Sequence, residues 1–118
     1  MSSTALILIV DDEQSILNLL QEILESEGFT ILRATNGRDA LTAALETPPD
    51  LIVTDLMMPI MDGRTLAQQL RQHPQTADTP ILLISAAYTR RDADRFTAVL
   101  HKPFDVAGLV ATIERLLV

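Results

Sequence analysis

The stretch Ala5-Leu6-Ile7-Leu8-Ile9-Val10-Asp11-Asp12 decides the fold of this chain. Its first six residues are apolar and rich in β-branched side chains, and the run is too short for a typical helix. It therefore predicts a strand that is buried on both faces, as in a parallel sheet covered by helices on either side. The two carboxylates at its end mark the place where that strand stops.

The rest of the chain alternates short apolar runs with longer stretches whose apolar residues recur at helical spacing. Further strands are predicted at residues 29–35, 51–54, 81–84 and 98–101. Helices are predicted at residues 14–27 and from 63 to about 72, where a turn at 59–62 precedes the second. Asn36 is expected to cap a helix that runs to about residue 46, and Asp105 is expected to cap the last one.

This alternation predicts an α/β fold, specifically a flavodoxin-like three-layer sandwich with a five-stranded parallel sheet of order 2-1-3-4-5 and helices on both faces. That order places the most apolar strands, the first, third and fourth, at the centre of the sheet. A length of 118 residues is typical of one domain, so residues 1–118 are interpreted as a single domain.

Composition excludes several classes of function. Hydrophobic residues make up 47% of the chain, which argues against disorder, and the absence of cysteine excludes disulfides, zinc–thiolate sites and thiol nucleophiles. A net charge of −7 disfavours direct binding to nucleic acid. No apolar run is long enough for membrane insertion, and Met1-Ser2-Ser3-Thr4 does not resemble a signal peptide, so a cytoplasmic location is expected.

Polar residues follow the ends of the predicted strands. Asp11 and Asp12 follow the first strand, Asp55 the third, Ser85 the fourth and Lys102 the fifth. Because open parallel sheets bind ligands at the carboxyl ends of their strands, these side chains are expected at one rim. The carboxylates of the neighbouring first and third strands would repel one another unless a cation neutralises them, and an oxygen-only cluster suits Mg²⁺.

Carboxylates beside a lysine and a hydroxyl form a site that suits a phosphoryl group. A divalent metal and an ammonium can neutralise the charge on the phosphoryl oxygens. A free carboxylate can attack phosphorus and form an acyl phosphate. Asp55 is the best candidate nucleophile, because it stands alone at the end of a central strand.

Four sets of residues match one known family in the same order along the chain. They are Ile9-Val10-Asp11-Asp12-Glu13, then Thr54-Asp55-Leu56-Met57-Met58-Pro59 with Met61-Asp62-Gly63, then Ser85-Ala86, and finally Lys102-Pro103-Phe104. With these motifs the chain resembles the receiver domain of two-component response regulators over essentially its whole length. Each motif is weak alone, and together they are highly specific.

The resemblance implies that Asp55 accepts a phosphoryl group from a histidine kinase or a histidine phosphotransfer protein. It also implies a Mg²⁺ site. Asp12 and Asp55 would bind the ion through their side chains, Met57 through its backbone carbonyl, and Asp11 through water.

The resemblance further implies that Lys102 pairs with the phosphoryl oxygens and that Ser85 swings to hydrogen-bond the phosphoryl group. That movement would be a conformational switch that modulates a downstream protein partner. In this view the chain is a regulatory domain that assists only its own phosphorylation and dephosphorylation. The peptide bond between Lys102 and Pro103 would be cis.

The chain departs from the family pattern after Ser85. Only residues 86–97 are available for the fourth helix and its two flanking loops, so that helix is predicted to be short, distorted or absent. Val99 occupies a position where the family often has an aromatic residue. In the same region Arg90, Arg91 and Arg95 alternate with acidic residues, which indicates a solvated face.

Three other interpretations stay open. Asp11 and Gln14 could be a capping box at the first predicted helix rather than part of a site. The chain could be a Mg²⁺-dependent phosphohydrolase with an aspartyl-phosphate intermediate, but such enzymes that resemble the haloacid dehalogenase group usually have a second acid where this chain has Met57. It could also be a receiver-like binding module that is never phosphorylated.

Overall fold

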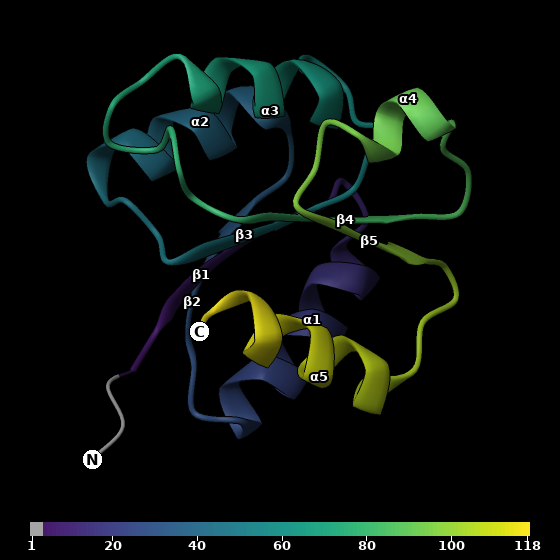
Figure 1. The fold of residues 1–118 in the computed structure, drawn as a ribbon. Coiled ribbons are helices and arrows are strands. Elements are labelled where there is room, and N and C mark those ends of the chain that lie inside the picture. Colours follow the sequence, from purple (N-terminus) through teal and green to yellow (C-terminus); the bar gives the residue numbers. More distant parts are fainter. Residues whose placement is uncertain (1–3) are drawn as a thin grey trace.

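The computed structural model describes residues 4–118 and has the predicted fold class. A five-stranded parallel sheet runs in the order β2-β1-β3-β4-β5 (Figure 1). The strands are β1 (Leu6–Val10), β2 (Thr30–Ala34), β3 (Leu51–Thr54), β4 (Ile81–Ser85) and β5 (Ala98–His101). The helices are α1 (Gln14–Ser26), α2 (Gly37–Glu46), α3 (Gly63–Arg71), α4 (Arg90–Ala93) and α5 (Val106–Leu116).

Two predictions made from the sequence concern the N-terminus and membrane insertion. The prediction that Met1 to Thr4 do not begin a signal peptide is not tested, since residues 1–3 lie outside the described part of the chain. Within residues 4–118, none of the helices combines the length and the apolar content that a membrane span requires.

The sheet separates two apolar cores. Helices α1 and α5 cover one face, and α2, α3 and α4 lie on the other (Figure 1). Because successive side chains of a strand point to opposite faces, Ile7 and Ile9 of β1 pack with α1 and α5, whereas Leu8 and Val10 pack with α2 and α3. Strands β3 and β4 are fully buried, as their continuous apolar runs predict.

Helix caps confirm two predictions and contradict one. Asn36 and Asp105 cap α2 and α5, with side chains that accept hydrogen bonds from the amides of Asp39 and Gly108. The capping-box interpretation of Asp11 is wrong, because the residue that caps α1 is Glu13 and its side chain makes no capping bond. The Asp11 carboxylate instead accepts hydrogen bonds from the Glu13 amide and from Lys102 Nζ.

Helix α4 is a single turn of four residues, which confirms the prediction of a short fourth helix. Thr89 and Asp92 form a capping box in which each side chain accepts the other's backbone N–H. The prediction of a solvated face is wrong at Asp92, which is 4% exposed, although Arg90 and Arg91 do face solvent. The alternating charges gave no indication that the carboxylate of Asp92 is buried.

Candidate functional site

The three acidic residues predicted at the strand ends lie together. Strands β1 and β3 are neighbours, and Val10 lies opposite Thr54 in the register, so the residues that follow them leave the sheet at the same level. Asp11, Asp12 and Asp55 each offer a carboxylate oxygen, and these oxygens lie within 4.8 Å of one another. Asp11 is buried, Asp55 is half-buried and Asp12 is exposed. The site therefore opens to solvent on the Asp12 side.

Lys102 reaches the same cluster from the far edge of the sheet. Its Nζ lies 3.1 Å from Asp11 Oδ2 and 3.5 Å from Asp55 Oδ2. Its backbone N–H donates to the carbonyl of Ser85 at 2.9 Å, which ties the end of β5 to the end of β4. The peptide bond that follows Lys102 is cis, as the resemblance implied. One ammonium thus bridges the two carboxylates that end the central strands.

The electrostatics of the cluster leave it short of positive charge. Burial raises the pKa of Asp55, and the negative charge of Asp11 adds to that rise, against the opposing effects of the Leu56 amide and Lys102. Burial alone would lower the pKa of Lys102, but its hydrogen bond to Asp11 and the charges of Asp11 and Asp55 outweigh burial and raise it. Three carboxyl groups thus gather around a single ammonium, so acidic groups outnumber basic ones in the cluster.

The donor set fits a hard divalent cation. Backbone hydrogen bonds already orient two of the carboxylates. Asp11 Oδ1 accepts from the Glu13 amide at 2.9 Å, and Asp55 Oδ1 accepts from the Leu56 amide at 2.8 Å. Burial disfavours the charged form of Asp55 and raises its pKa, and a cation beside the carboxylate would stabilise that charged form. Mg²⁺ prefers oxygen ligands and retains several of its waters when bound. A cluster of carboxylates that is open to solvent on one side meets both conditions.

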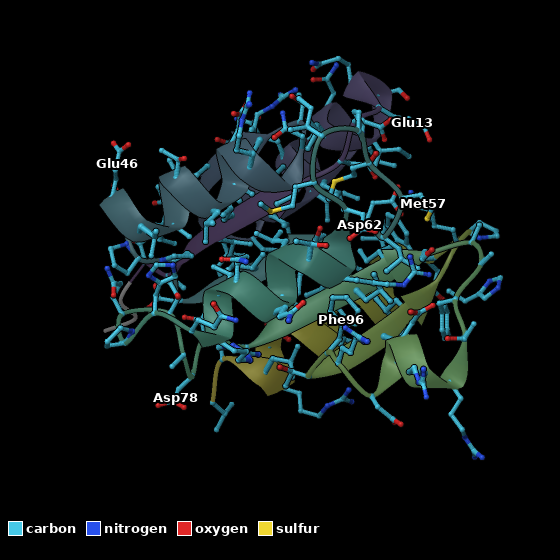
Figure 2. All side chains as sticks on the ribbon, turned by 90° about the horizontal axis from the view of Figure 1, so that it is seen from above. Glu13, Glu46, Met57, Asp62, Asp78 and Phe96 are labelled. Atoms are coloured by element: carbon cyan, nitrogen blue, oxygen red, sulfur yellow. The ribbon has the colours of Figure 1, made fainter. Side chains whose placement is uncertain are left out.

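Ser85 and Met57 lie beside the cluster in different ways. The Ser85 hydroxyl donates to the Ala87 carbonyl at 3.0 Å and accepts from the Ala87 amide at 3.3 Å, so it is engaged within its own loop. A contact between Ser85 and a group on Asp55 would require this pair of bonds to break. Met57 is 64% exposed on the loop after β3, near Asp62 (Figure 2). Because Mg²⁺ takes oxygen ligands rather than a thioether, only the backbone carbonyl of Met57 could bind it.

Two features near the site are not evident from the sequence. Ile60 has a φ of 72°, a left-handed conformation that β-branched residues rarely adopt. Arg64 forms a bidentate ion pair with Asp92, which lies 28 residues further along the chain. The spacing Thr89-x-x-Asp92 is a capping-box signature and could have identified the role of Asp92, but nothing local indicates Arg64 as its partner.

The comparisons with known proteins agree with this geometry. The family model described as the response regulator receiver domain matches residues 7–114. The DNA-binding dual master transcriptional regulator RpaA of Synechocystis is 38% identical over 119 aligned residues, which cover 94% of this chain and 48% of RpaA. The chain thus spans about half the length of that relative, and 32% of the regulator PhoP of Bacillus subtilis.

Solved structures show the same architecture. The chemotaxis response regulator CheY4 of Vibrio cholerae is 31% identical, with a TM-score of 0.92 over 98% of this chain and 100% of CheY4. The receiver domain of the sensor histidine kinase PA1611 from Pseudomonas aeruginosa has a magnesium ion in its active-site cleft. It is 23% identical, with a TM-score of 0.90 over 98% of each chain, and its likeness shows the fold alone.

Proposed function

Because this chain belongs to the response regulator receiver domain family, we propose that it is a phosphorylation-dependent signalling switch whose phosphoacceptor is Asp55. The observation that supports this proposal most directly is the cluster of Asp11, Asp12 and Asp55 with the ammonium of Lys102. The proposed donor is a histidine kinase or a histidine phosphotransfer protein. The proposed location is the cytoplasm, as the sequence predicts.

Asp55 is suited to act as the nucleophile. Its Oδ1 is held by the Leu56 amide, so the carboxylate has a defined orientation, while Oδ2 faces Lys102 at 3.5 Å. A carboxylate oxygen of Asp55 forms a bond to phosphorus as the P–N bond of the donor's phosphohistidine breaks. The electron pair of that bond goes to the imidazole nitrogen, which takes up a proton. The product is an acyl phosphate on Asp55.

Lys102 stabilises the transferred group. Its pKa is raised, so the side chain is protonated at neutral pH and can pair with phosphoryl oxygens. The ammonium already lies between Asp11 and Asp55, so little reorganisation is required. Mg²⁺, held by the side chains of Asp12 and Asp55, by the Met57 carbonyl and through water by Asp11, would supply charge neutralisation during the transfer.

An apolar groove of about 360 Å³ beside Lys102 favours a protein as the donor. The groove is lined by α1 and by the loops that follow β4 and β5, through Ile16, Leu19, Ala86, Lys102, Pro103 and Phe104. Because Lys102 belongs both to the groove and to the carboxylate cluster, a helix seated there would present a phosphohistidine close to Asp55. A small phosphate ester would leave this apolar surface uncovered.

The proposed output is a change in the affinity for a downstream protein. The phosphoryl group adds roughly two negative charges and three strong hydrogen-bond acceptors to the site. The Ser85 hydroxyl would leave Ala87 and bond to those acceptors, which would shift the loop that carries it. We propose no direct contact with nucleic acid for this domain, because its net charge is −7.

The test is intact-mass analysis after incubation with acetyl phosphate. Wild-type protein is expected to gain one phosphoryl group with Mg²⁺ and to gain none in the presence of a chelator. Asp55→Asn should gain none, whereas Asp62→Asn, which removes an acid from the same loop, should react like wild type. No uptake under any condition would favour the binding module that is never phosphorylated, and turnover of small phosphate esters would favour the phosphohydrolase.

A further inference from the structure

We propose that Arg64 couples the loop after Asp55 to helix α4, and that phosphorylation of Asp55 loosens the bond between Arg64 and Asp92 and releases α4. This inference deepens the proposed function and depends on it. It is based on a set of contacts, called here the Arg64 bridge, that joins Arg64 to Asp92 on one side and to Asp62 and Met57 on the other.

Helix α4 depends on contacts outside itself. A helix of four residues is not stable alone in water, because the cost of nucleation exceeds the gain from its few hydrogen bonds. The Asp92 carboxylate accepts from Arg64 Nε at 2.5 Å, from Arg64 Nη2 at 3.0 Å and from the Thr89 amide at 2.9 Å. The same carboxylate therefore closes the first turn of α4 and anchors that turn to α3.

The other side of the Arg64 guanidinium faces the loop after β3. Its Nη1 lies 3.6 Å from Asp62 Oδ2 and 3.9 Å from Met57 Sδ. Asp62 and Met57 both belong to the segment between Asp55 and α3, and Asp62 is the residue that caps α3 (Figure 2). One guanidinium is thus shared between the segment next to the phosphoacceptor and the segment that includes α4.

The start of α3 is rigidly connected to Asp55. The Gly63 amide donates to the Leu56 carbonyl at 2.7 Å, and a Cβ at position 63 would collide with the backbone carbonyl of Asp55. Because protein interiors are close-packed, a shift in the backbone of Asp55 must displace Gly63 and hence Arg64, its neighbour in the first turn of α3. The route from the site to α4 is therefore continuous.

Competition between two carboxylates for one guanidinium makes the Arg64 bridge a two-state element. Asp92 is buried and binds the guanidinium closely, whereas Asp62 is partly exposed and lies further away. New negative charge on Asp55 would favour the position of Arg64 nearer the loop after β3, at the expense of Asp92. Without Arg64, the Asp92 carboxylate would keep the Thr89 amide of its own capping box as a donor but would lose both guanidinium bonds, and α4 would open.

Hydrogen exchange of residues 86–97 tests this inference. In the metal-free protein, Arg64→Gln should increase exchange in this segment by about tenfold over wild type. Beryllium fluoride with Mg²⁺, used as the phosphoryl mimic, should increase exchange of the segment in wild type but add little in Arg64→Gln. Arg95→Gln, which removes an exposed arginine from the same region, is the matched control and should behave like wild type.

Intact mass after acetyl phosphate treatment separates the two proposals. Arg64→Gln should still take up one phosphoryl group, because Arg64 is no part of the carboxylate cluster. Wild-type protein that is phosphorylated but shows unchanged exchange over residues 86–97 would overturn the coupling and leave the proposed function intact. A full response to beryllium fluoride in Arg64→Gln would also overturn it. Asp92→Asn provides a second variant, with the same expected increase in exchange.

Discussion

Ile60 shows how a single residue near the site departs from ordinary backbone preferences. Its φ of 72° places a β-branched residue in the left-handed region, and 66% of its surface is exposed, so little packing compensates for the strain. A left-handed conformation costs roughly 1–2 kcal/mol for an L-residue other than glycine. The loop that follows Asp55 is therefore less stable than it would be with a glycine at position 60.

Ile60→Gly is expected to raise the free energy of unfolding by about 0.5–1 kcal/mol, because relief of the strain exceeds the extra entropy of glycine in the unfolded chain. Urea denaturation would measure the change. Ile60→Ala is the matched control, since it removes the side chain but keeps the Cβ, and it should gain much less. A glycine variant that is less stable than wild type would show that the side chain of Ile60 contributes to packing.

Among the helices, α4 shows how the contacts of one carboxylate can stabilise a helix that is too short to be stable alone. The hydrogen bonds from Arg64 and the Thr89 amide hold the pKa of Asp92 well below its usual range. Phe96, which follows α4, lies among the buried residues of the core beside α3 (Figure 2). The short helix is thus held at one end by an ion pair and at the other by an apolar anchor.

This lowered pKa predicts how stability depends on pH. Because Asp92 is ionised more readily in the folded protein, its contribution is present above the unfolded pKa of about 4 and is lost as the pH falls toward the folded value. Asp92→Asn should lower the urea midpoint at pH 7, and its difference from wild type should shrink between pH 5 and pH 3. Asp94→Asn, which removes an exposed acid beside α4, should show little difference at either pH.

At the scale of the whole molecule, the topology assembles the site from four strand ends. The order β2-β1-β3-β4-β5 sets β1 beside β3 and β4 beside β5, so Asp11 and Asp55 are neighbours and Lys102 is tied to Ser85. Residues as far apart in the sequence as Asp11 and Lys102 meet at 3.1 Å. The resulting excess of negative charge is a cost to folding that a bound cation would relieve.

Mg²⁺ is expected to stabilise the whole domain. Binding to the folded state alone at one hundred times the dissociation constant would add about 2.7 kcal/mol, which thermal denaturation with and without Mg²⁺ would detect. Asp12→Asn should lose most of this gain, whereas Glu13→Gln, a neutralised neighbour outside the cluster, should keep it. An equal gain in Asp12→Asn would argue that the metal binds elsewhere.

Local patterns were sufficient to predict the order of the elements, the central position of the most apolar strands, the caps at Asn36 and Asp105, and the strand-end residues that gather at one rim. These properties depend on periodicity, chain breakers and short-range hydrogen bonds, which neighbouring residues determine. Even the length of α4 follows from the few residues between Ser85 and Lys102.

The bonds of Asp92 to Arg64, the left-handed backbone of Ile60 and the engagement of Ser85 with Ala87 were beyond those patterns. Arg64 and Asp92 are 28 residues apart, and their pairing depends on how α3 and α4 pack over the same face of the sheet. Packing of this kind is a property of the assembled core, in which the position of each side chain depends on all its neighbours. For this reason the gathering of the strand-end residues could be predicted from the sequence, whereas the contact of Arg64 with Asp92 became evident only in the folded structure.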